Sequence, residues 1–152
     1  MKNVTLIILL FCGVRIFSQQ DVFQKLKEEL KNEHPEINFE NKLIVLNVWS
    51  VNDINSREAN VQVNKACIAY EFAKLKGGLK GVIGVIFCKN RDQKTETIIL
   101  NKDKVTKPII LKNISDQDLS NISNVIFDSN GNIVSKNITS DIFEEIHKLI
   151  TR

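Results

Sequence analysis

The most reactive side chains in this sequence are three cysteines, at positions 12, 67 and 88. A cysteine thiolate can attack a disulfide or a peroxide, and Cys88 ends an apolar run of the kind that forms a buried strand. Because ligand sites in open sheets lie at the carboxyl ends of the strands, Cys88 could be a lone reactive or peroxide-sensing thiol. The alternative is that Cys88 is a small buried hydrophobic residue at a strand end.

Cys67 and the two histidines are better explained by structure than by catalysis. Cys67 lies on or beside the apolar face of a helical pattern, where core packing is its expected role, and a disulfide to Cys88 is the alternative. Neither His34 nor His147 has further ligands near it in the sequence, so no zinc site or catalytic triad is predicted. We expect both histidines at the surface, no bound metal and no cofactor.

A polar cluster follows the first strand-like run, in the order Asp53, Asn55, Ser56, Arg57 and Glu58. Asn55 followed three residues later by Glu58 is similar to a capping box at the start of a helix. The cluster could accept a cation or a polar group of a partner. Helix capping explains the same residues without any ligand, so both interpretations stay open.

Helical periodicity predicts most of the elements that must position these residues. Apolar residues recur at helical spacing over residues 21–34, over residues 55–76 and from residue 141 onward. Gly77-Gly78 is expected to end the second of these helices. Residues 92–104 fit either a short helix or a polar strand, and we favour the helix because the preceding strand needs a crossover connection.

Apolar runs predict the strands. Residues 42–50 and 81–89 are continuous apolar runs typical of strands covered on both faces, and residues 108–112 predict a shorter strand. Residues 124–136 predict an antiparallel hairpin that turns at Asn130-Gly131. A strand, helix, strand order makes the first two strands parallel, so we predict an α/β fold with a mixed central sheet flanked by helices on both faces.

This order resembles the thioredoxin fold, and most closely the exported bacterial thioredoxin-like thiol-disulfide oxidoreductases. Such proteins carry a strand ending in an apolar-Trp pair, a turn with Trp-Cys-x-x-Cys, and a helix that often begins with Arg and an acidic residue. The segment LNVWSVNDINSRE has this layout, with Trp49 at the strand end and Arg57-Glu58 at the helix start. The segment NVIFDSNGNIVSKNI resembles the hairpin that leads to the family's last helix. The resemblance covers residues 41–150.

The resemblance places Asp53 and Ser56 where the family has its two reactive cysteines. The family reaction needs a thiolate at a helix N-terminus and a second thiol three residues on. Asp53 forms no exchangeable disulfide, and Ser56 is a weak nucleophile without a nearby base. The family's cis-proline, which helps to dock extended substrate, corresponds to about Ile122. The resemblance therefore implies a degenerate, redox-inactive thioredoxin-like site, with these candidate binding residues: Trp49, Asp53, Asn55, Ser56 and Ile122.

The first 18 residues have the features of a secretory signal peptide cleaved near Ser18. Lys2 precedes an apolar run over residues 4–14, which is short of the ~20 residues that cross a bilayer. Cys12 suggests a lipid anchor as the alternative, although Phe11 precedes it. We therefore expect a thioredoxin-like domain over residues 19–152 that is periplasmic or secreted after cleavage.

The charge of the chain limits its partners. A formal net charge of +3 falls to +1 once Lys2 and Arg15 leave with the signal peptide. A near-neutral chain without a basic run lacks the electrostatic footprint of nucleic-acid binding. The leading hypothesis is a module that binds a polypeptide or envelope protein, with no membrane span after cleavage. The alternatives are an oxidoreductase-related or peroxide-sensing protein that uses Cys88, and a secreted interaction module without a catalytic past.

Overall fold

The structure is a computed structural model that describes residues 19–89, 92–115, 119–139 and 141–151. The predicted signal peptide, together with Cys12, lies outside the described residues. Within them, the elements follow one another in the predicted order of helix, strand, helix, strand, helix, strands and final helix.

Five strands form one mixed sheet in the order β3-β2-β1-β4-β5. The first three strands run parallel to one another, whereas β4 is antiparallel to β1 and β5 is antiparallel to β4. Each predicted apolar run contains a strand: β1 (Leu43–Trp49), β2 (Val82–Cys88), β3 (Ile109–Ile110), β4 (Asn124–Phe127) and β5 (Ile133–Lys136). The predicted mixed central sheet of the α/β class is confirmed.

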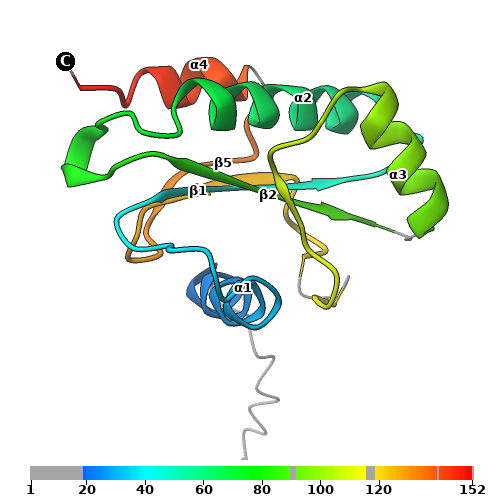
Figure 1. Ribbon diagram of the computed structural model, residues 1–152, viewed down its shortest axis with the longest axis horizontal. Coiled ribbons are helices and arrows are strands. Elements are labelled where there is room, and N and C mark those ends of the chain that lie inside the picture. The colour runs from blue at the N-terminus through cyan, green and yellow to red at the C-terminus, as the bar shows by residue number, and fades with distance from the viewer. Residues whose placement is uncertain (1–18, 90–91, 116–118, 140, 152) are drawn as a thin grey trace, which may run out of the picture.

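Helices cover both faces of this sheet (Figure 1). The helix α1 (Gln19–Glu33) lies alone across one face, while α2 (Ile54–Ala69) and α4 (Ile142–His147) lie side by side on the other. The helix α3 (Gln93–Lys102) forms the crossover between β2 and β3, so the predicted helix over residues 92–104 is also confirmed. A short 3-10 turn, η1 (Lys76–Gly78), precedes β2.

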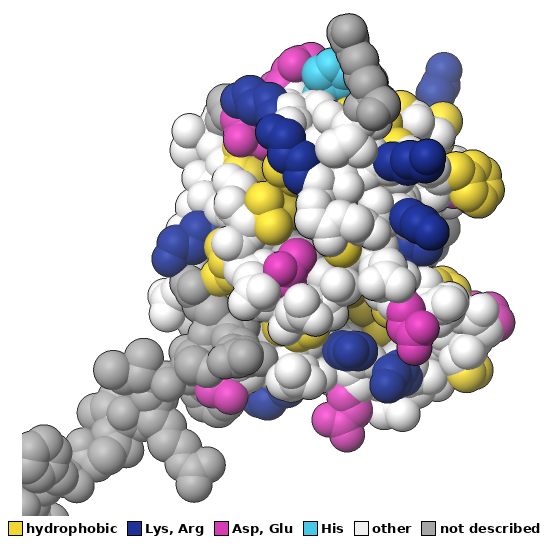
Figure 2. Space-filling view, turned by 90° about the vertical axis from the view of Figure 1, so that its left-hand side faces the viewer, with side chains coloured by type: hydrophobic (Ala, Val, Ile, Leu, Met, Phe, Trp, Pro, Cys, Tyr) yellow, Lys and Arg dark blue, Asp and Glu magenta, His cyan; other side chains and the backbone are white. Residues whose placement is uncertain are grey.

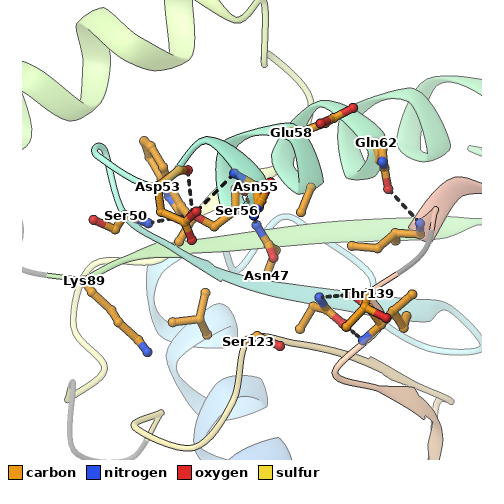
Figure 3. A pocket seen from close by; sticks show the side chains of 16 residues that line it. Asn47, Ser50, Asp53, Asn55, Ser56, Glu58, Gln62, Lys89, Ser123 and Thr139 are labelled. Carbon is orange, nitrogen blue, oxygen red and sulfur yellow. Dashed lines mark hydrogen bonds between the residues drawn. The ribbon is translucent and has the colours of Figure 1, made fainter.

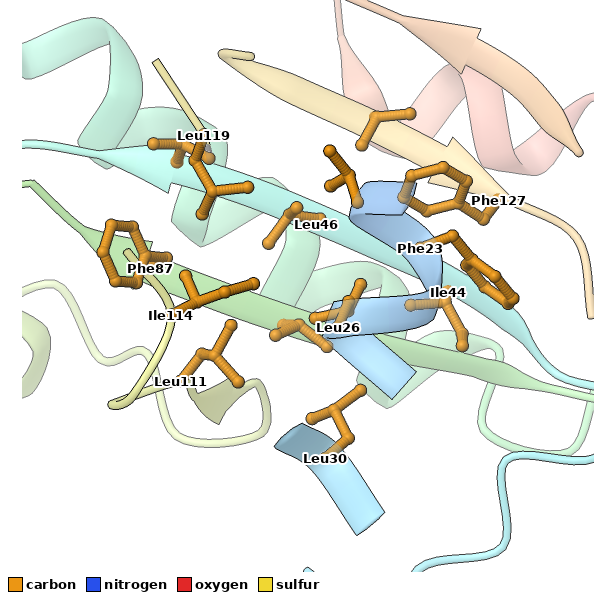
Figure 4. Close-up of a cluster of buried hydrophobic side chains, with 14 of the residues drawn as sticks. Phe23, Leu26, Leu30, Ile44, Leu46, Phe87, Leu111, Ile114, Leu119 and Phe127 are labelled. Carbon is orange, nitrogen blue, oxygen red and sulfur yellow. The ribbon is translucent and has the colours of Figure 1, made fainter. Parts of the chain in front are cut away.

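The core beneath α1 follows from two periodicities that meet. The apolar stripe of α1 contributes Phe23, Leu26 and Leu30, each 1% exposed or less. Alternate side chains of β1 point to the same face, and Ile44 and Leu46 pack against that stripe (Figure 4). Val22 and Phe23 of α1 are 4% and 1% exposed, so the chain packs against the sheet within a few residues of the predicted cleavage site.

The opposite face brings α2 unusually close to the sheet. A Cβ atom added to Gly84 in β2 would lie 2.6 Å from both the Cys67 Sγ atom and a Val63 methyl carbon of α2. Because real Cβ atoms do not approach other heavy atoms so closely, a side chain at position 84 would push α2 away. The glycine therefore sets the height of α2 over the strands whose ends form the site described below.

The second helix is shorter than predicted. It ends at Ala69, and the chain then folds back on itself, with Lys74 opposite Lys80 and Leu75 opposite Ile150 in isolated antiparallel bridges. Gly77-Gly78, predicted as the helix end, instead makes the turn of this loop, with φ values of +74° and +79°. Tertiary pairing of the loop has overridden the helical pattern of residues 70–76.

Candidate functional site

The candidate site is a cleft of about 470 Å³ at the carboxyl end of β1 (Figure 3). Its walls come from the first turns of α2 and from residues 123–124, 138–139 and 142, which lie far from α2 in the sequence. Four of the five predicted binding residues line it together: Trp49, Asp53, Asn55 and Ser56.

Ile122, the fifth predicted residue, does not line this cleft. It is half-buried against the apolar cluster under α1, whereas the next two residues, Ser123 and Asn124, form the cleft wall. The residue that reaches the cleft is therefore Ser123, one position after the Ile122 that the resemblance indicated. A role for Ile122 in binding stays a prediction.

Asp53 caps the start of α2. Its backbone is extended, with φ −102° and ψ 105°, and its carboxylate accepts a hydrogen bond of 3.1 Å from the Asn55 amide N–H. The predicted cap at Asn55 is therefore wrong, because the helix begins one residue earlier, at Ile54. An exposed carboxylate at this position satisfies a free N–H group and complements the helix dipole.

The Ser56 hydroxyl is held by backbone groups. It donates a hydrogen bond of 3.0 Å to the Asp53 carbonyl oxygen and accepts one of 3.1 Å from the Ser50 N–H. Its proton goes to this backbone oxygen, and among the described residues no imidazole or carboxylate accepts it, so the hydroxyl has no base to activate it as a nucleophile. Its observed role is to join the end of β1 to the first turn of α2.

Two buried amides that the sequence analysis missed form the floor beneath α2. Asn47, 1% exposed on β1, donates from Nδ2 to the Ser56 carbonyl oxygen at 3.0 Å and to the Asn60 Oδ1 atom at 2.7 Å. These two acceptors fix the orientation of both amides. In the described part of the chain, the Asn60 Nδ2 atom is then a buried donor without a partner. The two side chains behind the start of α2, Asn47 and Asn60, are thus neutral.

Trp49 and Cys88 lie side by side in β1 and β2 and are both 1% exposed. They share a small apolar cluster with Leu100 and Val105 from the α3 region. Trp49 therefore forms a buried wall of the cleft. The Cys88 thiol sits at the carboxyl end of its strand, as predicted, but burial keeps it out of contact with solvent.

The far wall of the cleft is built by polar contacts between distant segments. The Gln62 side-chain oxygen accepts a hydrogen bond of 2.7 Å from the Ile142 N–H at the start of α4. The Asn124 amide makes two hydrogen bonds to the backbone of Ile138, at 2.7 Å and 3.1 Å. These contacts fix both sides of the cleft before any ligand enters it.

A partly buried ion pair positions the start of α2. Arg57 donates from Nε and one terminal nitrogen to the two carboxylate oxygens of Asp103, at 2.8 Å and 2.6 Å. The side chains are 22% and 16% exposed. Such bidentate geometry restrains orientation as well as distance. The pair therefore ties the first turn of α2 to the end of α3.

The same ion pair predicts a pH-dependent contribution to stability. The Arg57 hydrogen bonds lower the pKa of the Asp103 carboxyl, against a smaller opposing effect of desolvation. Because the folded pKa lies below the unfolded one, this contribution is complete above the unfolded value of about 3.9 and disappears as pH falls through the lowered folded pKa. We expect Asp103→Asn to be less stable than wild type at pH 7, with the gap narrowing below pH 4. Urea unfolding across this range measures it, and a gap independent of pH would contradict the assignment.

The remaining thiol and imidazoles take the structural roles expected of them. Cys67 is 6% exposed, and burial raises the pKa of its thiol to about 11. Cys67 and Cys88 are free thiols that belong to separate apolar clusters, so the alternative of a disulfide between them is wrong. His147 is exposed and lies 2.8 Å from the Tyr70 hydroxyl, and His34 is partly exposed beside Glu36.

The described residues offer neither a cluster of metal ligands nor a helix that could cross a membrane. They contain no group of three or more His, Cys, Asp or Glu side chains placed to hold a metal ion. Among the same residues, every helix falls short of the length and apolar character needed to cross a membrane.

No family model and no curated protein matches the sequence. Solved structures do match. The thioredoxin domain of a thiol-disulfide oxidoreductase from Bacteroides vulgatus superimposes with a TM-score of 0.57 at 16% identity, over 72% of this chain and 80% of that chain. A thioredoxin-like protein from Parabacteroides distasonis gives 0.54 at 20% identity, over 74% and 86%.

A secreted disulfide oxidoreductase from Mycobacterium tuberculosis gives a TM-score of 0.54 at 10% identity, over 73% of this chain and 84% of that chain. At such low identities the likeness concerns the fold, and it extends over most of each protein. The sheet order, the helices on both faces and these superpositions agree: the chain has the thioredoxin-like fold, as the sequence resemblance predicted.

Proposed function

We propose that this protein is an exported, redox-inactive member of the thioredoxin-fold proteins that binds a polypeptide segment of an envelope partner in the cleft beside α2. The observation that carries the proposal is the cleft itself. It keeps a volume of about 470 Å³ and a lining rich in neutral amides and hydroxyls, while the two positions at the helix start hold Asp53 and Ser56.

Three features support the absence of disulfide chemistry. Asp53 and Ser56 are engaged as a helix cap and a backbone clamp, and neither carries sulfur. The Asn47 amide behind them donates to the Ser56 carbonyl oxygen and is neutral, so it cannot take up a proton from a thiol. The nearest thiol in β2, Cys88, is buried. Thiol-disulfide exchange requires an accessible thiolate, which these side chains do not supply.

The lining of the cleft supports a polypeptide as the ligand. Amides and hydroxyls can pair with the N–H and C=O groups of a peptide backbone, which carries no charge. The titratable side chains in the described lining are Asp53, Glu58 and Lys89, so the net charge of the lining is close to neutral. A strongly anionic or cationic ligand would find little electrostatic complement here.

Export is supported by the N-terminal sequence. The apolar run and the small residue near position 18 fit a signal peptide. One structural neighbour, from Mycobacterium tuberculosis, is described as secreted. A periplasmic or secreted location is therefore part of the proposal.

Titration with an unfolded polypeptide tests the binding function. Trp49 is the single tryptophan of the chain and borders the cleft, so its fluorescence reports on ligand entry. Reduced and carboxymethylated ribonuclease A, which lacks tryptophan, serves as the probe. We expect saturable fluorescence change with wild type, and at least about tenfold weaker binding, equivalent to about 1.4 kcal/mol, for Thr139→Phe, which fills the cleft from its exposed rim.

The matched control places the same side chain elsewhere. Thr97→Phe on the exposed side of α3 should bind like wild type. Equal loss in both variants, or no saturable signal with wild type, would exclude polypeptide binding in the cleft.

A parallel insulin-reduction assay with dithiothreitol should give the blank rate. Turnover by wild type that disappears in Cys88→Ser would favour the alternative enzyme and end the redox-inactive interpretation.

A further inference from the structure

The end of the molecule opposite the cleft carries an unusual pair of lysines. Lys74 and Lys80 face each other in an isolated antiparallel bridge. The Leu75 N–H donates to the Leu79 carbonyl oxygen and the Gly81 N–H donates to the Ala73 carbonyl oxygen, so hydrogen bonds flank the lysine pair rather than join it. Side chains of such a non-hydrogen-bonded pair lie closest together, and like charges placed there repel.

Two more lysines add to this charge. Lys76 is exposed in the turn between the paired lysines. The Lys42 Nζ atom lies 2.9 Å from the position that a Cβ atom on Gly81 would take, and Lys42 shares the lining of a second cavity with Phe72. We call this set of residues the basic end: Lys42, Phe72, Lys74, Lys76 and Lys80.

Acidic side chains offset only part of this charge. Glu71 lies beside the basic end but is 3.7 Å from Lys107, with which it pairs. Glu40 is exposed next to Asn41, whose carbonyl oxygen accepts a hydrogen bond from the Lys80 N–H. The four lysines of the basic end therefore keep a net positive charge that a ligand of opposite sign would relieve.

The apolar side chain at this end is as unusual as its charge. Phe72 is 84% exposed, the highest value among the exposed large hydrophobic residues described. Ile68, at the end of α2, is 55% exposed. Figure 2 looks onto this end of the molecule, and at its upper right dark blue basic side chains alternate with exposed yellow apolar ones, although acidic side chains also lie on this face. Exposed apolar groups among lysines are typical of a membrane-surface contact.

We propose that the basic end is a peripheral docking surface for an anionic phospholipid bilayer, with the lysines facing the headgroups and Phe72 entering the interface. The lysines would also suit an acidic protein, but the 84% exposure of Phe72 among them favours insertion between lipid headgroups. The surface lies at the start of β1, and the cleft lies at its end, so this inference does not depend on what the cleft binds.

Vesicle sedimentation tests this surface. The full chain and a chain beginning at Gln19 are both used, because the apolar run over residues 4–14 can itself bind lipid, and variants are compared within each form. Vesicles contain phosphatidylcholine alone or with phosphatidylglycerol. We expect binding to the anionic vesicles that weakens with salt. Lys74→Gln with Lys80→Gln should weaken it about 25-fold, or about fivefold for each lysine.

A matched pair of variants separates docking from general charge. Lys94→Gln with Lys102→Gln removes two exposed lysines from α3 and should weaken binding less than about threefold. An equal loss in the two double variants would overturn the proposal. Phe72→Ser should also weaken binding without changing the net charge. Undiminished vesicle binding by folded Phe72→Ser would show that charge alone holds the protein at the headgroups and that Phe72 does not enter the interface, which also overturns the proposal.

Discussion

Asp53→Cys combined with Ser56→Cys is expected to give this protein a disulfide-reductase activity above that of the wild type. In the insulin assay we expect a rate at least about tenfold above the uncatalysed one, because two adjacent thiols replace a bimolecular reaction by an intramolecular one. The two positions are three residues apart at the start of α2, and position 53 already has the extended backbone of a helix cap.

The local fields at the helix start favour the first of these thiols. The Asn55 N–H that now bonds the Asp53 carboxylate would be free to stabilise a thiolate at the same position. The single variant Asp53→Cys should form a mixed disulfide with a thiol reagent at neutral pH but should not turn over insulin. Ser56→Cys alone should react more slowly, because residue 56 is half-buried and clamped to the backbone.

The double variant can also contradict the assignment of the site. If it folds like wild type by circular dichroism, and its thiols react with a small reagent but never with each other or with insulin, the helix start does not present positions 53 and 56 in exchange geometry. The alignment of these residues with the family's two cysteines would then be wrong.

Phe23→Ala is expected to reduce the free energy of unfolding by about 3–5 kcal/mol. Phe23 is 1% exposed, its ring centroid lies 5.2 Å from that of Phe127, and its ring closes over Gly131 of the hairpin turn. Removing the ring leaves a cavity between α1 and the sheet. Urea denaturation followed by Trp49 fluorescence measures the change through the shift in midpoint.

An exposed neighbour on the same helix provides the control. Gln24→Ala should change stability by less than about 0.5 kcal/mol. A Phe23→Ala variant within 1 kcal/mol of wild type would mean that α1 does not pack on the sheet in solution. The chain from Gln19 would then not be an integral part of the domain.

Short sequence patterns correctly predicted elements that depend on neighbouring residues: apolar runs and a glycine turn. The continuous apolar runs of β1 and β2 allowed burial on both faces, and the hairpin turn was predicted from Asn130-Gly131. Gly131 indeed has φ of +85°, a conformation that favours glycine. The Asp92 cap of α3 accepts a hydrogen bond from the Lys94 N–H, which resolved the ambiguous segment in favour of a helix.

Long-range pairing explains where prediction failed. Residues 70–76 keep a helical spacing of apolar side chains, but the Lys74–Lys80 and Leu75–Ile150 bridges draw this segment out of α2. No single window of sequence contains both partners of the second bridge. For the cap, the segment offers Asp53 and Asn55 close together, and only the observed backbone shows that Asp53 is used.

The predicted binding residues that line the cleft all come from one wall, formed by the end of β1 and the start of α2. Its α2 wall is continuous with Trp49 in the sequence, whereas Ser123 and Thr139 reach it through the fold of the hairpin. Asn47 carries a usable signal in the sequence, because it is the one polar residue within the strand LIVLNVW, and it is buried. A buried amide in such a run needs a partner, and Asn60 on the facing helix supplies it.

The strand β1 joins the basic end to the cleft, and its length sets the distance of the cleft from any membrane bound at the basic end. Its 7 residues, at about 3.3 Å each, separate the two by roughly 20 Å. If the basic end rests on headgroups, the mouth of the cleft stands well clear of the lipid and opens to the aqueous phase. A partner would then be met as a soluble chain or as a domain held off the membrane, and lipid tails would be out of reach.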